Sequence, residues 1–409
     1  MKTNGSPIVD VLIAGGGQVG LALALALRRA APKLAVTLVD AMAAAEADRQ
    51  GRASTIAAGG QRMLAALGVW DAIAGDAEPV TAMIVTDSRT GDLVRPVFLT
   101  FAAENGEPSA YVVADGVVVA ALRAGAEAAG VTLIAPDAVI DFAAEGSRVR
   151  GALNSGAEIS ARLLVAADGV RSRLRDLAGI ATVGHDYGQS GIVVTVAHEK
   201  PHGGRAEEHF LPGGPFAILP LKGNRASLVW TEPTDLADRL VAEDPLVFQA
   251  ELERRFGHRL GRIEMIDRPR AFPLKLAIAR AFVAPRFALV GDAAHSIHPI
   301  AGQGLNLGYR DVAALAETIV DAHRLGLDIG TMTVLDRYQR WRRYDSTEMA
   351  LFTDGLNRAF ANDNPALRLA RDTALGVVER MPALKRMFVR EAAGDGIGSV
   401  PRLIRGEAI

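Results

Sequence analysis

The chain has 409 residues, and its 45 Lys or Arg against 47 Asp or Glu give a formal charge of −2. At roughly 150 residues per domain, this length predicts two or three domains, and the near-neutral charge excludes a broad basic surface for nucleic acid. The 49% of apolar residues and 22% of charged residues are typical of a globular protein. Because there is no cysteine, disulfides, thiolate catalysis and cysteine-built metal sites are excluded, and we expect a cytoplasmic protein.

The first forty residues predict a βαβ unit. Apolar runs over 8–13 and 35–39 predict two strands, and helical spacing over 18–30 predicts a helix between them. We expect neither a signal peptide nor a membrane span here, because Asp10 precedes the apolar run and glycines interrupt it.

A glycine-rich turn joins the first strand to this helix. Residues 15–20 have the spacing G-x-G-x-x-G, in which Gly15 permits the tight turn, Gly17 lets a pyrophosphate approach and Gly20 allows close helix–strand packing. Asp40 ends the second strand, where a carboxylate can accept hydrogen bonds from the adenosine ribose. The sequence therefore predicts a site for a dinucleotide with an unphosphorylated ribose, such as FAD or NAD.

The elements that follow interrupt the α/β rhythm. Ser54 is expected to cap a helix that runs to Leu67. The other predicted elements are strands over 81–87 and 93–101, a helix over 115–129, and strands over 131–134 and 163–166.

From about residue 183 to 282, short strands alternate with glycine and proline turns, which predicts a largely antiparallel second domain. A strand over 287–290 and helices over most of 303–389 follow. We expect an α/β fold in which a Rossmann-like dinucleotide domain carries an inserted, largely antiparallel β-sheet substrate domain and a helical C-terminal region. The predicted parts are 1–75, 106–182 and 285–362 for the dinucleotide domain, 76–105 and 183–284 for the substrate domain, and 363–409 for the C-terminal helical segment.

The strand over 287–290 leads to a second group of polar residues. Asp292 can hold polyol hydroxyls at the end of this strand, and free N–H groups of the helix that opens at Gly302-Gln303-Gly304 can stabilise negative charge on a reduced ring. His295 and His298 lie three residues apart without an evident third ligand, so we predict no metal site.

Three segments in this order resemble the fingerprints of the class A flavoprotein aromatic hydroxylases, which share the para-hydroxybenzoate hydroxylase fold. They are residues 15–20, Ala167-Asp168-Gly169-Val170-Arg171-Ser172-Arg173-Leu174-Arg175, and Gly291-Asp292. Within that fold, residues 291–315 and 338–345 are similar to the hydroxylases of ubiquinone biosynthesis. The resemblance runs from Asp10 almost to Ile409.

The resemblance implies a role for each matching residue. Gly15, Gly17, Gly20 and Asp40 would bind the ADP half of FAD, and Asp292 would bind its ribityl chain. Asp168 is associated with FAD and, indirectly, with the pyridine nucleotide. Arg52 and Pro299 would position flavin and substrate, and Gly302 and Gly304 would lie against the flavin ring. Asp115 departs from the amide or arginine that relatives carry, so it is assigned no flavin contact.

The resemblance also implies the activity. An FAD-dependent monooxygenase would take hydride from NAD(P)H, capture O2 as a flavin C4a-hydroperoxide and hydroxylate a small aromatic substrate, a phenolic ubiquinone precursor expected to carry a prenyl tail. Two alternatives stay open: a flavoprotein of the same fold with another aromatic or isoprenoid substrate, and a non-catalytic flavoprotein subunit of a biosynthetic complex.

Two further regions each allow two interpretations. Phe216, Leu219 and Trp230 would form an apolar wall of the substrate pocket, or belong to ordinary core strands. Residues 364–409 carry eight Lys or Arg and five Asp or Glu, a net charge of +3, beside Leu384, Met387 and Phe388. This C-terminal region would touch the inner face of an anionic membrane, or form a solvated helical face packed on the domain.

Overall fold

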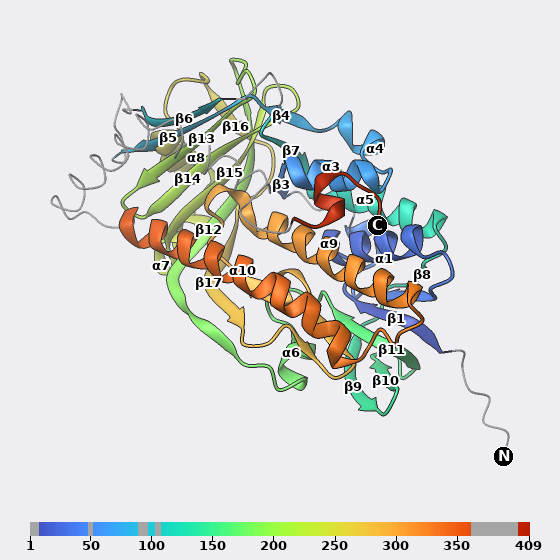
Figure 1. The fold of residues 1–409 in the computed structure, drawn as a ribbon. Coiled ribbons are helices and arrows are strands. Elements are labelled where there is room, and N and C mark those ends of the chain that lie inside the picture. The colour runs from blue at the N-terminus through green and yellow to red at the C-terminus, as the bar shows by residue number, and fades with distance from the viewer. Residues whose placement is uncertain (1–7, 48–51, 89–96, 103–107, 361–399) are drawn as a thin grey trace.

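The computed structural model describes residues 8–47, 52–88, 97–102, 108–360 and 400–409 (Figure 1). In this part of the chain the strands form three sheets. The first sheet has the order β18-β19-β11-β1-β2-β8, with β10 and β9 extending it from β11. Its strands are β1 (Val9–Ala14), β2 (Val36–Val39), β8 (Thr132–Ile134), β9 (Val139–Glu145), β10 (Arg148–Leu153), β11 (Glu158–Ala166), β18 (Val283–Ala284) and β19 (Phe287–Leu289).

The centre of this first sheet is parallel and buried. Strand β1 pairs in parallel with β2 and β11, and β11 pairs in parallel with β19. Runs of Val, Leu and Ile are typical of parallel strands that are covered on both faces. Helix α1 (Gln18–Ala30) packs against α5 (Asp115–Ala128) and α9 (Gln303–Arg324), and α9 packs against α10 (Met332–Phe360). The βαβ unit predicted from the sequence is confirmed.

The second and larger sheet has the order β20-β17-β12-β15-β14-β13-β5-β6, with β16 paired to β12. It is antiparallel except for the parallel pair β13 and β5. Its strands are β5 (Ala82–Asp87), β6 (Val97–Ala102), β12 (Thr182–His198), β13 (Arg205–Leu211), β14 (Gly214–Leu221), β15 (Arg225–Pro233), β16 (Ile263–Met265), β17 (Arg270–Ala279) and β20 (His295–Ser296).

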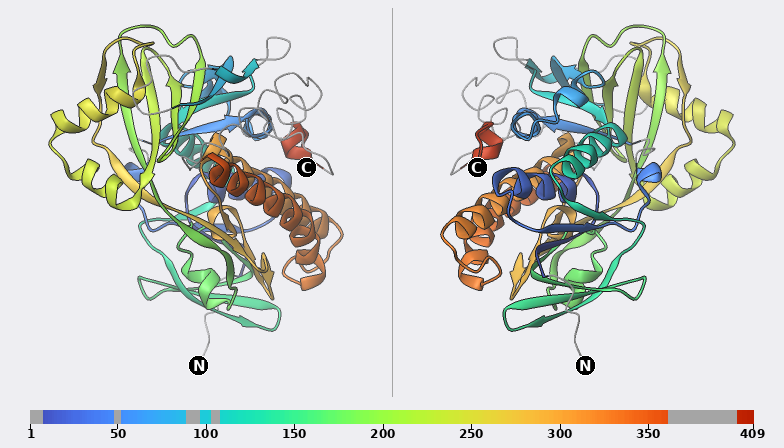
Figure 2. Two further views of the ribbon diagram at one scale, coloured as in Figure 1. Left: turned by 90° about the vertical axis from the view of Figure 1, so that its left-hand side faces the viewer. Right: turned by 90° about the vertical axis from the view of Figure 1, so that its right-hand side faces the viewer.

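The two faces of the large sheet are covered differently. Helices α7 (Thr234–Ala242) and α8 (Pro245–Phe256) cover one face, which we call the outer face (Figure 2). The other, the inner face, is turned toward α10 and toward the small sheet β3-β7-β4, whose strands are β3 (Ala53–Ala57), β4 (Glu78–Val80) and β7 (Ala110–Ala114). The inner face of the large sheet therefore adjoins the dinucleotide part of the molecule.

One predicted helix start is wrong. Ser54 does not cap a helix, because it lies within strand β3, and helix α3 (Ala58–Ala66) begins after that strand. Strand β3 pairs with β7, and the side chain of Asn306 accepts a hydrogen bond from the Ala57 N–H at 2.9 Å. Tertiary pairing thus holds this segment extended against its local capping signal.

The remaining described elements are short, and no described helix is long and apolar enough to cross a bilayer.

The C-terminal residues include a turn over Arg402–Arg405, in which Leu403 and Ile404 are buried in the main core. Leu384, Met387 and Phe388 lie outside the described residues, and the predicted domain boundaries stay predictions. The short helices are α2 (Ala44–Ala47), α4 (Asp71–Ala74) and α6 (Arg173–Leu177).

Candidate active site

The glycine-rich turn lies at the carboxyl ends of the parallel strands, where ligands bind in open α/β sheets. Gly15 has φ +115°, and a Cβ there would lie 2.2 Å from the carbonyl oxygen of Ala167. A Cβ on Gly20 would lie 2.0 Å from the carbonyl oxygen of Gly15. At both positions only glycine fits, because backbone of the neighbouring segment fills the space.

Gly17 differs from these two glycines. It is the N-cap of α1, and a Cβ added to it would meet no heavy atom within 4 Å. The free N–H groups of the helix and this open space together form a cradle for a phosphate group. A Cβ on Gly16 would lie 2.4 Å from Asp40 Oδ2, so the Asp40 carboxylate stands directly beside the turn. These features fit the ADP half of a dinucleotide.

The second fingerprint is held by backbone contacts at the end of β11. Ser172 caps α6 by accepting a hydrogen bond from the Arg175 N–H at 3.0 Å, and Arg175 Nη1 donates to the carbonyl oxygen of Ala293 at 3.2 Å. Asp168 Oδ2 accepts from the Leu174 N–H at 3.3 Å, whereas Asp168 Oδ1 is buried and has no partner among the described residues. The second and third fingerprints are therefore joined, with an unpaired carboxylate oxygen beside the glycine turn.

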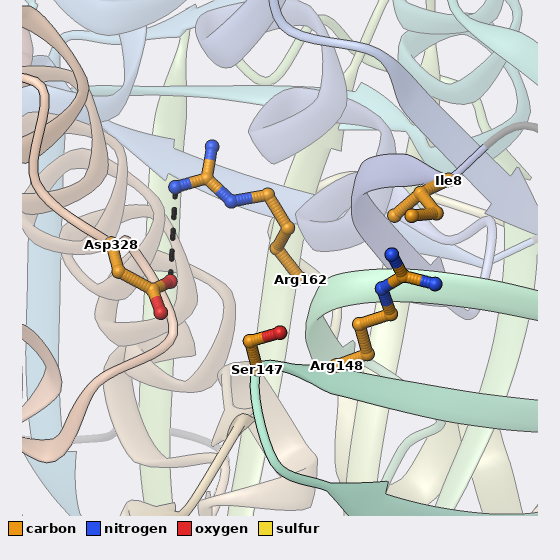
Figure 3. A pocket seen from close by; sticks show the side chains of 5 residues that line it. All are labelled: Ile8, Ser147, Arg148, Arg162 and Asp328. Carbon is orange, nitrogen blue, oxygen red and sulfur yellow. Dashed lines mark ion pairs between the residues drawn. The ribbon is translucent and has the colours of Figure 1, made fainter.

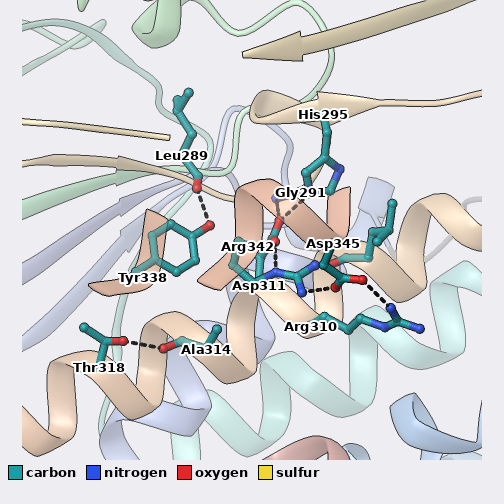
Figure 4. Close-up of polar contacts among 11 residues, drawn as sticks. Leu289, Gly291, His295, Arg310, Asp311, Ala314, Thr318, Tyr338, Arg342 and Asp345 are labelled. Atoms are coloured by element: carbon teal, nitrogen blue, oxygen red, sulfur yellow. Dashed lines mark hydrogen bonds and ion pairs between the residues drawn. The ribbon is translucent and has the colours of Figure 1, made fainter. Parts of the chain in front are cut away.

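The third fingerprint is fixed by the buried carboxylate of Asp311 on α9 (Figure 4). Asp311 Oδ2 accepts a hydrogen bond from the Gly291 N–H at 2.9 Å and lies 2.6 Å from His295 Nε2. Arg342 Nε of α10 donates to Asp311 Oδ1 at 2.7 Å. This one side chain connects the loop that carries Asp292 to both long helices.

These contacts set the charges in the network. Burial alone would lower the pKa of His295, but the Asp311 carboxylate holds it above its usual value. Burial alone would raise the pKa of Asp311, but His295 and Arg342 hold it below its usual value. Both groups are engaged in this pairing, which gives His295 a structural role. Among the described residues, no cluster of His, Asp and Glu is arranged to hold a metal ion.

Arg52 lies at the start of β3, beside the glycine turn. Its Nε donates to Asp115 Oδ2 at 2.9 Å, and Gln18 Nε2 donates to Asp115 Oδ1 at 3.1 Å. The charge of Asp115 and, less strongly, that of Asp292 raise the pKa of Arg52. The Arg52 side chain remains 61% exposed. Its guanidinium can therefore reach a ligand while the ion pair with Asp115 holds its Nε in place. The structure thus brings together Arg52 and Asp292, which are 240 residues apart in the sequence.

The loop after Asp292 completes this side of the site. Pro299 opens a short turn over Ile300–Gly302, and Gly302 has φ +62° with its Cα facing Thr55 of β3. Gly304 is open, because a Cβ there would meet nothing within 4 Å. Asn306 Nδ2 donates to the Thr55 carbonyl oxygen at 3.0 Å and thereby fixes strand β3, which directly follows Arg52.

The three residues predicted to line the substrate pocket do not share one face. Leu219 lies on the inner face of the large sheet and contacts the cluster that includes Ala53 and Val112. Phe216 and Trp230 are paired across β14 and β15 and are fully buried on the outer face against α7 and α8. The prediction is therefore wrong for Phe216 and Trp230, because strand alternation points their side chains away from the dinucleotide site.

Several residues of the site had been given no role there from the sequence. Asp115 and Asn306 fix Arg52 and its strand, and Asp311 fixes the Asp292 loop. His298 is fully buried with both ring nitrogens unpartnered among the described residues, and its ring lies 5.0 Å from that of Tyr187. Burial lowers the pKa of His298 to about 4, so the ring is neutral near pH 7.

A separate pocket of 430 Å³ lies far from this site (Figure 3). Ile8, Ser147, Arg148, Arg162 and Asp328 line it, and Arg162 Nη2 is 3.7 Å from Asp328 Oδ1. Ile8 precedes β1, whereas Gly15 follows it, so this pocket is at the opposite end of the parallel strands. It is not part of the dinucleotide site.

Comparison with known proteins agrees with this geometry. Residues 8–352 match the FAD binding domain family. The chain is 46% identical to the ubiquinone hydroxylase UbiL of Rhodospirillum rubrum, covering 98% of this chain and 93% of that protein. It is 37% identical to the 3-demethoxyubiquinol 3-hydroxylase of Escherichia coli, covering 94% and 98%.

A solved structure shows the same fold. The p-nitrophenol 4-monooxygenase PnpA of Pseudomonas putida superposes with a TM-score of 0.80 at 20% identity, covering 96% of this chain and 99% of that one. The predicted fold class is therefore confirmed, as are FAD as the cofactor and NAD(P)H and O2 as co-substrates. The chain belongs to the FAD-binding family of flavoprotein monooxygenases that includes the hydroxylases of ubiquinone biosynthesis.

Proposed function

We propose that this enzyme hydroxylates the ring of a phenolic ubiquinone precursor with a prenyl tail. The observation that carries the proposal is the contact between the Pro299 loop and the inner face of the large sheet. Ile300 packs in one cluster with Val85 and Phe210 of that face. A ring held between loop and sheet would lie beside the dinucleotide site, and the names of the two curated relatives support this substrate class.

The residues around the cradle would divide the binding of FAD among them. We assign Gly15, Gly17, Gly20 and Asp40 to the ADP half and Asp292 to the ribityl chain. We assign Asp168 to FAD and, indirectly, to the pyridine nucleotide, and Arg52, Pro299, Gly302 and Gly304 to the surroundings of the flavin ring. Bound FAD supplies the redox chemistry with NAD(P)H and O2, while the protein orients the substrate and excludes water.

The prenyl tail requires an apolar surface next to the ring. Leu219, Leu221 and Met83 lie together on the inner face and pack toward Val80. Burial of a tail against such side chains is favourable by about 25 cal/mol per Å² of apolar area. This part of the inner face is our proposed path for the tail.

The direct test of this function is product analysis. Purified holoenzyme should consume NAD(P)H in the presence of 2-(3-methylbut-2-enyl)phenol and O2, and mass spectrometry should show a product heavier by one oxygen atom. Consumption of NAD(P)H with peroxide as the sole product would point to another substrate. Absence of any consumption would favour the non-catalytic flavoprotein.

Contact with the inner face of the membrane is a separate part of the proposal. It rests on the basic charge of residues 364–409, of which residues 364–399 carry six Lys or Arg against four Asp or Glu, a net charge of +2, and on the apolar tail of the proposed substrate. Residues 400–409 contact α3 and α9 in the structure, so the contact would belong to residues 364–399. Sedimentation of the protein with phosphatidylglycerol vesicles but not with phosphatidylcholine vesicles would support the membrane contact. Absence of sedimentation with either kind of vesicle would contradict it.

A further inference from the structure

Two consecutive glutamates on β13 have opposite surroundings. Glu207 is on the outer face, where His209 Nε2 lies 3.1 Å and Arg205 Nε 3.1 Å from its carboxylate oxygens. Arg259 also forms an ion pair with it. Although burial alone would raise the pKa of Glu207, these partners hold it below its usual value. Glu207 is a paired structural carboxylate.

Glu208 points to the inner face and is only 5% exposed. No hydrogen bond or ion pair to its carboxyl is found within the described residues. Burial is the sole cause that raises its pKa, to about 8. An unpaired buried carboxyl costs about 1–3 kcal/mol, so its presence here requires an explanation.

The neighbours of Glu208 place its side chain on the part of the inner face that adjoins the Pro299 loop. Its register partners are Ala217 of β14 and Val85 of β5, neither of which titrates. Two residues further along the same face, Phe210 packs with Ile300 of the Pro299 loop. Two residues before it, Ala206 packs with Ala53, the neighbour of Arg52. Along β13, the Glu208 carboxyl therefore lies between a residue that contacts the Pro299 loop and a residue that contacts the segment next to Arg52. We propose that the substrate ring binds between these two segments.

We propose that Glu208 binds the substrate by forming a hydrogen bond with the hydroxyl group of the phenol ring. This inference rests on the proposed function and names the side chain that would recognise the head group. A hydroxyl would satisfy a carboxyl that no protein group satisfies, and the apolar side chains around it would exclude competing water. Because a site built to bond a hydroxyl rejects analogues that lack one, Glu208 would orient the ring as well as hold it.

The test compares two probes that differ by one oxygen atom. Binding of 2-(3-methylbut-2-enyl)phenol and of 3-methylbut-2-enylbenzene to the holoenzyme is measured by equilibrium dialysis at pH 7. The ratio of the two affinities isolates the hydroxyl group from the tail. Glu208→Met, of similar length but apolar, should lower this ratio about tenfold, whereas Glu208→Gln, which can still accept the hydrogen bond, should keep it within about threefold.

Glu207→Gln is the matched control, because it changes the neighbouring carboxylate on the outer face. It should leave the affinity ratio unchanged while lowering the thermal midpoint. Bound FAD and the thermal midpoint are measured for every variant, and Glu208→Leu replaces Glu208→Met if the latter loses FAD. A wild-type ratio in the apolar variant would overturn the role of Glu208.

Product formation by the wild-type holoenzyme separates this inference from the proposed function. If wild type makes the hydroxylated product while the apolar variant keeps the wild-type ratio, the function stands and Glu208 is not its anchor. If wild type makes no product, the proposed function fails, and the affinity ratios still decide whether Glu208 binds the hydroxyl.

Discussion

Buried glutamates have different surroundings on the outer and inner faces of the large sheet. On the outer face, Trp230 Nε1 donates to Glu232 at 2.8 Å and Arg255 Nε donates to the same carboxylate at 3.0 Å. On the inner face, Glu208 is unpaired, and the nearby Asn357 Oδ1 and Thr231 Oγ1 are buried without partners among the described residues. Since buried polar groups are normally satisfied, the isolated carboxyl of Glu208 supports our proposal that the inner face binds the substrate.

The comparison also shows why burial alone does not identify a pocket. Phe216 and Trp230 are large, apolar and fully buried, yet they belong to the face that is closed by helices. The inner face has the smaller side chains Ala206, Ala217 and Leu219. Small apolar residues therefore lie beside the isolated carboxyl on the inner face, whereas large aromatic side chains pack together on the outer face.

A large loss of stability at pH 7 is expected from a substitution on the outer face. Glu232→Ala removes the common partner of Trp230 and Arg255 and should lower the free energy of unfolding by about 3 kcal/mol, because a buried guanidinium loses a charge partner. Chemical denaturation measures the loss. Glu145→Ala, which breaks an exposed pair with Arg150, should cost less than about 1 kcal/mol; equal losses would mean that the outer-face pairing contributes no special stability.

Two glycines of the turn also differ in their surroundings, because Gly17 faces open space and Gly20 faces the backbone of Gly15. Gly17→Val should lower FAD affinity on the order of a hundredfold, because its side chain occupies open space where a pyrophosphate approaches the backbone, and the apoprotein should keep its thermal midpoint. Gly20→Val should instead destabilise the fold, since its Cβ meets the Gly15 carbonyl oxygen at 2.0 Å. Fluorescence titration with FAD and thermal melts distinguish the two. Unchanged FAD affinity in Gly17→Val would show that the cradle lies elsewhere.

The inner-face carboxyl predicts a pH dependence of stability. Burial raises the pKa of Glu208 to about 8, so between the usual pKa and 8 the unfolded chain has lost a proton that the folded chain keeps. Stability contributed by the neutral carboxyl is full below about pH 4.5 and decreases by about 1.4 kcal/mol per pH unit as pH rises to 8. Glu208→Gln should remove this slope in urea denaturation of the holoenzyme between pH 5 and 8. An identical slope in both proteins would place the carboxyl in a solvated environment.

The smallest predicted effect concerns coupling. Leu219→Ala should raise the peroxide released per NAD(P)H about twofold, because it opens the apolar wall that keeps water from the site. Phe216→Leu on the outer face should lower stability by about 1 kcal/mol and leave the product-to-NAD(P)H ratio unchanged. NAD(P)H, peroxide and product are measured together in each protein. A changed ratio in Phe216→Leu alone would reverse our assignment of the two faces.

Local sequence signals predicted the βαβ unit and its glycine turn well, because the turn geometry depends on glycines at fixed spacing. Gly15 and Gly20 are confirmed as positions where only glycine fits. The predicted helix start at Ser54 was wrong because two distant segments hold residues 53–57 extended. These segments are strand β7, which pairs with β3, and α9, whose Asn306 side chain accepts a hydrogen bond from the Ala57 N–H. Local capping preferences are weak against such pairing.

The substrate face was harder to predict than the cofactor site. A two-residue period separates the faces of a strand, but it does not tell which face adjoins another domain, and this is why Phe216 and Trp230 were assigned to the pocket. The adjacent glutamates at 207 and 208 could have predicted a buried carboxyl on the inner face. Two consecutive residues of a strand point to opposite faces, so one of the two had to lie there. Assigning each glutamate to a face required the positions of Arg205, His209 and Arg259 around Glu207.

The buried carboxylate of Asp311 has a consequence for the synthesis of the protein. It links the loop at Gly291 to Arg342, and strand β19 completes the sheet beside β11 only when residues 287–289 are available. A nascent chain that has emerged from the ribosome as far as residue 300 thus contains the glycine turn and Asp292 but not the side chains that fix the Asp292 loop. We therefore expect stable cofactor loading to follow translation of α10, and ribosome-bound chains from which Arg342 has not emerged should retain FAD less well than the complete chain.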